Sequence, residues 1–260
     1  MKILMIGDVV GSAGVRLLTD RLRDVRKKHK IDFVVANVEN IANGVGILPH
    51  LAEELLAAGV DVMTSGNHAF DRKEATDYFK SEPRMLRPAN YPEGVPGAGM
   101  WLGEHNTGVS IAVINLMGRA NMPRTDCQFR KADSLMKELS NRADVILIDH
   151  HAEATAEKIA LARYLDGQVS AVVGTHTHVA TADEQVLPAG TGYITDMGMT
   201  GSHSGVIGMS LDSVLERFLS GLPVRLGSAE GDVRMNGVLI DVDTSTGHST
   251  AISRLCVRHF

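Results

Sequence analysis

Short apolar runs alternate with amphipathic stretches through the first 180 residues of the chain. The runs MKILMIGD, IDFVVANVEN and DVMTSGNHAF each lead into polar residues, which is typical of buried strands that end in loops. Helical periodicity predicts helices from Ala13 to about His29, over LPHLAEELLAAGV as far as about Gly59, and from near Asp71 onward. This alternation of strands and helices predicts an α/β architecture with at least partly parallel strands.

The pattern becomes less regular in the middle of the chain and changes character near its end. The segment from Pro83 to Asn121 is richer in glycine and proline and holds one clear strand, GVSIAVINL. A helix near Arg130 to Asn141, the strand ADVILIDHH, a helix near Ala154 to Leu165 and the strand VSAVVGTHTH follow. GTGYITD, NGVLIDVD and STAISRLCVRH then indicate antiparallel strands, with one helix around Leu211 to Leu219. A single two-sheet domain over residues 1–260 is the simplest organisation.

Composition narrows the setting in which this domain acts. The chain carries 26 basic and 31 acidic residues, a formal charge of −5, and has no concentrated basic surface signal, which argues against duplex nucleic acid as a partner. Only two cysteines occur, Cys127 and Cys256, without paired spacing, so a reducing compartment is the natural setting. The first apolar run, Ile3 to Ile6, is too short for a secretory segment, and no later run reaches membrane-span length. We therefore expect a cytoplasmic protein without a membrane partner.

Candidate chemistry is concentrated where the apolar strands end. Five strands lead into groups of potential metal ligands: Asp8; Glu39-Asn40; Asn67-His68; His150-His151; and His176-Thr177-His178. Each group alone has a structural explanation, such as helix capping or turn formation. His176 and His178 would share one face if their strand continued through them. Because the carboxyl ends of strands border the ligand crevice of open α/β sheets, the five groups together predict a metal centre there.

The ligand types narrow the metal further. Oxygen donors from Asp8, Glu39 and Asn67, combined with several imidazoles, suit iron, manganese or zinc rather than calcium or copper. The ligands exceed what one four-coordinate ion needs, and one carboxylate could bridge two ions about 3.5–4 Å apart. The sequence therefore predicts a two-metal site.

Five segments, taken in order, resemble the motifs of the calcineurin-like metallophosphoesterase superfamily: GDVV, NVEN, GNHA, DHHAEAT and GTHTH. The chain departs from the usual pattern in three places. Val10 stands where a histidine ligand is expected, Glu39 stands where a bridging aspartate is expected, and Ala69 replaces an acidic residue. Together with ENIANGVGI and TDMGMTG, these departures are similar to the YmdB-like branch. The resemblance implies an α/β fold, a two-sheet α/β/β/α sandwich of the metallo-dependent phosphatase type.

The resemblance also implies an activity and a set of roles. The branch is associated with 2′,3′-cyclic-nucleotide 2′-phosphodiesterase activity, which leaves a 3′-nucleotide, and with a di-iron centre, with manganese as an alternative. One metal would be held by Asp8, Glu39, Asn40 and His178, and the second by the bridging Glu39 with Asn67, His151 and His176. His151 is preferred to His150 because it immediately precedes Ala-Glu-Ala-Thr, and His150 is expected to be a packing or rim residue. A hydroxide bridging the metals would attack phosphorus, with His68 as the general acid.

Several alternatives stay open from the sequence. A phosphomonoesterase of the same fold and a metal-retaining regulatory or nucleotide-binding protein both fit the ligand set. A metal-dependent amidohydrolase is suggested by the His-x-His motif, although in that fold the motif would come near the first strand. Base preference, native metal, a homo-oligomeric state and the roles of Arg119, His203 and residues 195–202 are also open.

Overall fold

The computed structural model describes residues 1–258 and contains two β-sheets that pack face to face. The strands of the first sheet lie in the order β2 (Asp8–Val9), β11 (Met199–Ser202), β12 (Val233–Asp243), β1 (Lys2–Ile6), β3 (Phe33–Asn37) and β4 (Val62–Thr64), with β13 (His248–Arg258) paired to β12. The second sheet has the order β5 (Met100–Glu104), β6 (Ser110–Met117), β7 (Val145–His151), β8 (Ala171–Thr175), β10 (Gly192–Ile194) and β9 (Gln185–Val186).

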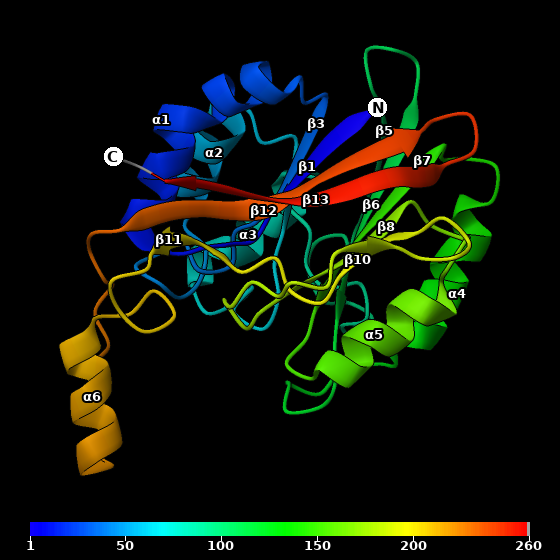
Figure 1. Ribbon diagram of the computed structural model, residues 1–260. Helices are drawn as coiled ribbons and strands as arrows, with labels where there is room; N and C mark the ends of the chain where they lie inside the picture. The colour runs from blue at the N-terminus through cyan, green and yellow to red at the C-terminus, as the bar shows by residue number, and fades with distance from the viewer. Residues whose placement is uncertain (259–260) are drawn as a thin grey trace.

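Helices cover the outer face of each sheet (Figure 1). On the first sheet lie α1 (Gly11–His29), α2 (Pro49–Ala58) and α3 (Lys73–Ser81), and on the second lie α4 (Gln128–Leu139) and α5 (Thr155–Tyr164). The sixth helix, α6 (Leu211–Ser220), projects away from both sheets. The predicted α/β/β/α sandwich is therefore confirmed, and it differs from the barrel on which the amidohydrolase alternative rested.

Alternation along the strands explains the layers. In β1, Leu4 and Ile6 pack toward the helices of the first sheet, whereas Ile3 and Met5 pack between the two sheets against residues such as Val113. Successive side chains of a strand point to opposite faces, so a strand that is apolar throughout requires cover on both sides. The near-continuous apolar runs of the sequence are the cause of this four-layer arrangement.

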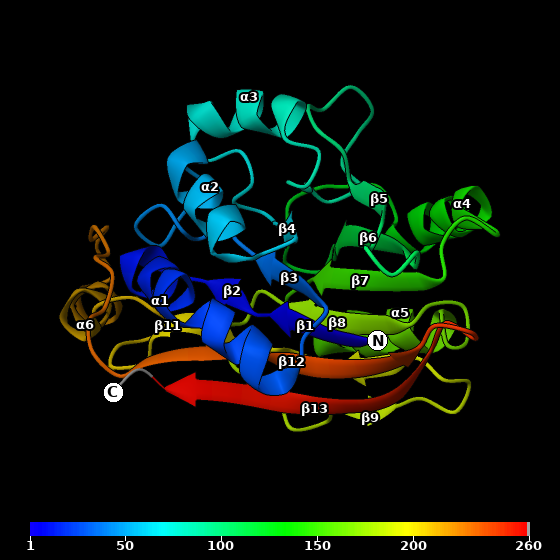
Figure 2. The ribbon, with the colours of Figure 1, turned by 90° about the horizontal axis from the view of Figure 1, so that it is seen from above.

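The regular elements follow the sequence predictions closely, and two differences stand out. Helix α1 begins at Gly11 rather than Ala13. The strand predicted in GTGYITD, β10, pairs antiparallel with β9 but parallel with β8, so that prediction was only half right. β12 and β13 form the expected antiparallel pair (Figure 2), while His259 of the predicted last strand lies outside the described residues.

Parallel pairing places the functional strand ends together. β1, β3 and β4 run parallel in the first sheet, and β6, β7 and β8 run parallel in the second. Their carboxyl ends form the edge at which the predicted ligands emerge. Across residues 1–258, no helix has the length and apolar character that crossing a membrane requires. The organisation of residues 1–260 as one domain stays a prediction.

Candidate metal centre

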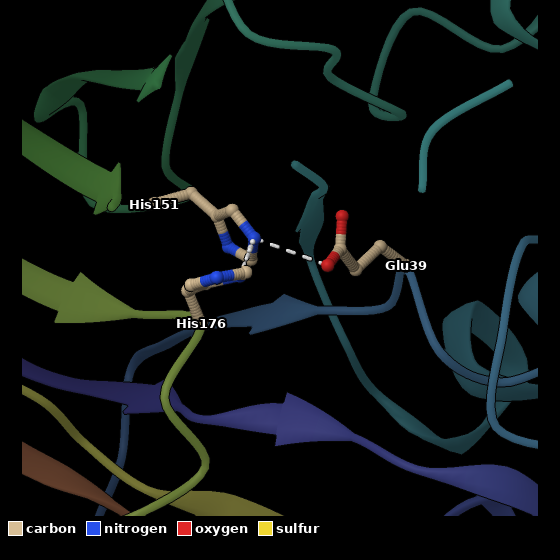
Figure 3. A group of neighbouring side chains, drawn as sticks. All are labelled: Glu39, His151 and His176. Carbon is tan, nitrogen blue, oxygen red and sulfur yellow. Dashed lines mark hydrogen bonds and ion pairs between the residues drawn. The ribbon is translucent and has the colours of Figure 1, made fainter. Parts of the chain in front are cut away.

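Three predicted ligands converge on the Nε2 atom of His151, which lies at the end of β7. Asn67 Oδ1 and His176 Nδ1 each lie 3.0 Å from this nitrogen, and Glu39 Oε1 lies 3.1 Å from it. Figure 3 shows Glu39, His151 and His176 pointing toward one another from three different strand ends. One donor atom from each of these three lies within 4.8 Å of the others. The structure thus brings together residues that are more than 130 positions apart in the sequence.

The remaining predicted ligands form a second group beside the first. Asn40 Nδ2 lies 3.2 Å from His178 Nε2, and Asp8 Oδ1 lies 3.9 Å from the same nitrogen. Asp8 Oδ1 is also 3.8 Å from His151 Nδ1, so Asp8 lies between the two groups. All seven predicted metal ligands therefore lie at one edge of the sandwich, in the two groups that the resemblance implied.

Backbone N–H groups hold the two carboxylates in place. His176 N donates to Asp8 Oδ2 at 3.0 Å, and His68 N donates to Glu39 Oε2 at 2.9 Å. Each carboxylate keeps its other oxygen for the centre of the site. The backbone of Gly66 lies against the His151 ring. A Cβ atom at Gly66 would lie 2.1 Å from His151 Cδ2, so only glycine fits at this position of GNHA.

The His176-Thr177-His178 segment is not a continued strand, which corrects the sequence argument. β8 ends at Thr175, and His176 and His178 have left-handed backbone φ angles of 98° and 65°. Their backbone positions do not share a strand face. These conformations are uncommon for residues other than glycine and persist where the surrounding structure enforces them.

A buried ion pair contacts the backbone of the His176-Thr177-His178 segment. Lys158 Nζ lies 2.7 Å from Asp196 Oδ2, and both side chains are about 1% exposed. Asp196 Oδ2 also accepts a hydrogen bond from Thr177 N at 3.2 Å, while its Oδ1 accepts one from Gly198 N at 2.8 Å. The pair was not identified from the sequence, where Lys158 is one lysine of the helix predicted near Ala154 to Leu165 and Asp196 is only part of TDMGMTG.

A hydrogen-bond relay fixes the His151 ring. His151 Nδ1 lies 2.9 Å from Thr175 Oγ1, which donates to Asp149 Oδ1 at 2.6 Å. This arrangement keeps a proton on Nδ1 and turns Nε2 toward the centre of the site. Neither Thr175 nor Asp149 was predicted to have a role. The available signal was alternation, because Asp149 and His151 share one face of β7.

His150 points to the opposite face of β7 and is completely buried. Its two ring nitrogens have no hydrogen-bond partner within residues 1–258. Burial, together with the nearby charge of Lys158, lowers the pKa of His150 to about 3, so the ring is neutral. His150 is therefore a packing residue and not a rim residue.

The two carboxylates of the site have opposite pKa shifts. Burial raises the pKa of Asp8 to about 6, although His178 and His151 oppose this rise. Burial also acts to raise the pKa of Glu39, but the adjacent His151 outweighs it and lowers that pKa to about 2. Glu39 is therefore ionised at neutral pH in the metal-free protein.

The pKa values of His151 and His176 also shift in opposite directions. Burial acts to lower the pKa of His151, but the carboxylates of Glu39 and Asp8 outweigh it and raise the pKa to about 9. Burial and the positive charge of His151 lower the pKa of His176 to about 3. The metal-free site thus holds a proton on His151 beside the Glu39 carboxylate, at the position where a cation is favoured.

The residues present fit a metal ion. Asp8 Oδ1 is buried and accepts no hydrogen bond from the described part of the chain, and such an orphaned oxygen is costly unless a cation is nearby. The donor atoms around His151 Nε2 are spaced 3.0–3.1 Å from it. Neighbouring ligands of an octahedral ion with about 2.1 Å bonds are about 3 Å apart, so the spacing agrees.

His68, the predicted general acid, lies at the rim. Its side chain is 34% exposed, and its Nδ1 is 2.7 Å from Asp71 Oδ2, three residues further along. The carboxylate orients the ring, so that Nε2 is the nitrogen available to a substrate. Asp71 was expected only as the start of a helix, although its position three residues after His68 was visible in the sequence.

Comparison with known proteins places this site in a family. The model of the YmdB-like protein family matches residues 4–255. The chain is 47% identical to the 2′,3′-cyclic-nucleotide 2′-phosphodiesterase of Bacillus subtilis over 99% of this chain and 97% of that protein. It is 33% identical to a putative phosphatase/phosphodiesterase of Mycoplasma genitalium over 98% of this chain and 92% of that protein.

Solved structures share the fold. A hypothetical protein from Thermus thermophilus has a TM-score of 0.93 at 42% identity, with 99% of both chains covered. A novel phosphatase from Mycoplasma pneumoniae also has a TM-score of 0.93, at 30% identity, with 99% of this chain and 93% of that chain covered. The family match and these full-length similarities confirm the resemblance seen in the sequence motifs, and the chain belongs to the YmdB-like protein family.

Proposed function

We propose that this protein is a two-metal phosphodiesterase that hydrolyses 2′,3′-cyclic nucleotides to 3′-nucleotides. The observation that carries the proposal is the convergence of Glu39, His151 and His176 on one point at the strand ends. The name of the Bacillus subtilis relative, which is similar over nearly the whole chain, supports the substrate class. The deep burial of Asp8 and Glu39 supports a bound cation rather than an exposed acidic cluster.

In this proposal each metal has its own group of ligands. Asp8, Asn40 and His178 would hold one ion, Asn67, His151 and His176 would hold the other, and Glu39 would contribute to both. Iron suits this mixture of carboxylate, amide and imidazole donors, and manganese is the alternative. Bound ions would supply Lewis acidity toward phosphate oxygens and lower the pKa of an attacking water.

His68 then acts on the leaving group. Hydrolysis adds water across the bond between phosphorus and O2′: the hydroxide oxygen bonds to phosphorus, and O2′ leaves with the electron pair of that bond. His68 Nε2 donates the proton that O2′ takes up, which produces a 2′-hydroxyl and a 3′-phosphomonoester. Asp71 holds the ring in the orientation that this transfer needs.

The first experiment measures metal content and hydrolysis of 2′,3′-cyclic AMP together. We expect about two metals per chain and formation of 3′-AMP by the wild type, and loss of both metal and activity in Asn67→Ala. His68→Ala should retain metal but lose about 10²–10⁴-fold in turnover, the usual contribution of a general acid. Asp71→Asn should lower kcat without loss of metal. The control is Asp77→Asn, which replaces an exposed aspartate of α3 paired with Lys80 and should leave kcat unchanged.

The outcomes separate the alternatives. A protein that gains neither metal nor activity from iron or manganese would contradict the enzyme proposal and favour a regulatory or nucleotide-binding role. Faster hydrolysis of 3′-AMP than of the cyclic diester would identify a phosphomonoesterase. Normal turnover in His68→Ala would remove this residue from the mechanism. The cytoplasmic location, the exclusion of duplex nucleic acid and membranes, and a homo-oligomeric state remain predictions.

A further inference from the structure

A large cleft lies along the loop between β6 and α4 and contains none of the proposed metal ligands. It has a volume of about 720 Å³, and its lining includes Arg119, Met122, Arg124, Gln128, Phe129 and Glu157. We call it the arginine cleft. Its volume lies in the range of small-molecule sites, which is about 300–1,000 Å³.

The arginine cleft begins one strand away from His151. Met117, the last residue of β6, is the register partner of His151, and Gly118 N donates to His151 O at 2.9 Å. Neighbouring strands are about 4.8 Å apart and two further residues add at most about 7 Å, so the backbone of Arg119 lies within about 12 Å of that of His151. The loop that lines the cleft therefore begins beside the strand end that carries His151, one of the proposed metal ligands.

Two guanidinium groups make the cleft a site for an anion. Arg119 and Arg124 are both exposed, and neither forms an ion pair in the part of the chain that the structure describes. The carboxylate of Glu157 also lines the cleft but forms no ion pair with either guanidinium within the described residues; it accepts hydrogen bonds at 3.0–3.2 Å from the N–H groups of Arg119, Ala120 and the Gln128 side chain. Glu157 thus fixes the loop, while the guanidinium groups remain free for phosphate.

The floor of the arginine cleft has an unused acceptor and apolar surface. Gln128 is 2% exposed, and its Oε1 accepts no hydrogen bond from residues 1–258. Such an orphaned acceptor suits an N–H group of a ligand. Met122 and Phe129 add apolar surface of the kind on which nucleobases pack. Cationic, apolar and accepting groups together match a nucleotide rather than an isolated ion.

We propose that the arginine cleft binds the phosphate on the 5′ oxygen of the cyclic-nucleotide substrate, with Arg119 and Arg124 as its ligands. This inference rests on the proposed function and specifies its substrate class: a cyclic nucleotide that carries a 5′-phosphate. That phosphate is either the terminal group of a mononucleotide or the next phosphodiester of an oligoribonucleotide. The two sources share the chemistry that the guanidinium groups recognise.

The test compares three substrates: 2′,3′-cyclic AMP, its 5′-phosphorylated form, and a diadenosine dinucleotide that ends in a 2′,3′-cyclic phosphate. We expect the wild type to show about tenfold higher kcat/KM on at least one of the two extended substrates, mainly through KM, because exposed charge pairs contribute modestly. The advantage should fall with added salt. It should disappear in Arg119→Gln/Arg124→Gln and persist in Arg163→Gln, which removes an exposed arginine of α5 outside the cleft.

The outcomes are assigned as follows. A preference for both extended substrates identifies the 5′-phosphate itself, and a preference for the dinucleotide alone identifies an oligonucleotide end. Equal kcat/KM on all three substrates, or a preference that survives in Arg119→Gln/Arg124→Gln, would overturn the proposal. If the wild type hydrolyses none of them, the proposed function fails, and calorimetry tests the cleft separately. Tighter binding of adenosine 3′,5′-bisphosphate than of 3′-AMP, lost in the double variant, would support the cleft, and equal affinity would overturn it.

Discussion

His151 is the residue on which the candidate site is centred. Three other proposed ligands lie 3.0–3.1 Å from its Nε2, so a small rotation of the ring would disturb each of these contacts. Its orientation is set by the relay through Thr175 to Asp149, whose carboxylate also accepts a hydrogen bond from Asn37 Nδ2 at 3.1 Å. Such outer partners fix both the tautomer and the direction of a ligating imidazole.

Thr175→Val tests this relay. The variant keeps the shape of the side chain but removes the hydroxyl, so His151 Nδ1 loses its partner and the ring is free to turn. We expect metal affinity to fall about 10–100-fold, the usual effect of losing an outer partner. Competition with a fluorescent chelator measures the affinity, and Thr175→Ser, which keeps the hydroxyl, is the matched control. Unchanged affinity in Thr175→Val would show that the relay does not orient the ligand.

At the scale of elements, the segment after β8 depends on its neighbours for its shape. Gly174 lies so close to the segment after β10 that a Cβ atom would be 1.7 Å from Thr195 O. The Lys158–Asp196 pair then holds Thr177 N between two histidines with left-handed backbone conformations. A helix of the second sheet and a loop after β10 therefore determine where two proposed ligands point.

Lys158→Met tests this support. The variant leaves the carboxylate of Asp196 buried without its counter-charge, so we expect unfolding free energy to fall by about 3–5 kcal/mol. Adding Asp196→Asn removes the unpaired charge and should recover part of the loss. Lys80→Met breaks an exposed pair with Asp77 and should cost less than about 1 kcal/mol. Denaturant unfolding gives all three values, and equal losses for Lys158→Met and Lys80→Met would contradict the prediction.

At the scale of the whole molecule, the candidate metal centre draws its residues from both sheets. Asp8, Glu39, Asn40 and Asn67 come from the first sheet, and the three histidine ligands come from the second. Ions bound between them would link the layers at the edge where the sheets meet. Metal binding is therefore expected to stabilise the whole fold, because ligands that bind the folded state raise its stability.

This stabilisation should depend on pH. In the metal-free protein the pKa of His151 is about 9, above its unfolded value of about 6.5, so its pairing with Glu39 stabilises the fold below pH 6.5. That contribution is lost as the pH rises through about 9. A metal requires the deprotonated ring, so competition from the proton weakens over the same range. We expect the rise in Tm on adding manganese to increase by about 3–5 °C per pH unit between pH 6.5 and 8.5.

Differential scanning fluorimetry with manganese and with a chelator measures this rise in Tm. His50→Gln, which removes an exposed histidine of α2, should show the same trend as the wild type. A rise that is constant or decreases with pH would show that no proton is displaced from His151.

The tertiary structure also decides which apolar residues are exposed. Helix α6 was expected around Leu211 to Leu219, but it projects away from the sheets (Figure 1). Its residues Phe218 and Leu219 are 80% and 85% exposed. Periodicity describes a helix with an apolar face and does not say whether another element covers that face. The exposed residues of α6 are therefore a property of how the chain packs.

The sequence by itself determined most strands and helices and a single two-sheet organisation, while the family resemblance implied the sandwich and the residues of the candidate site. It could do so because apolar runs and helical periodicity are local patterns, and because parallel strands bring their carboxyl ends to one edge. The family motifs specified which polar residues at that edge to choose. Strand ends indicated five candidate groups, and the resemblance selected His68 and the seven proposed ligands from them.

Only the tertiary structure revealed the residues that orient the proposed ligands and His68. Thr175, Asp149, Asp71 and the Lys158–Asp196 pair act through contacts whose role local patterns, such as the alternation that pairs Asp149 with His151, did not specify. The left-handed conformations of His176 and His178 depend on segments from three different elements, and the parallel pairing of β10 with β8 depends on the whole sheet. Burial, pKa shifts and the arginine cleft likewise arise from neighbours that are distant in sequence, because they depend on which surfaces meet when the chain packs.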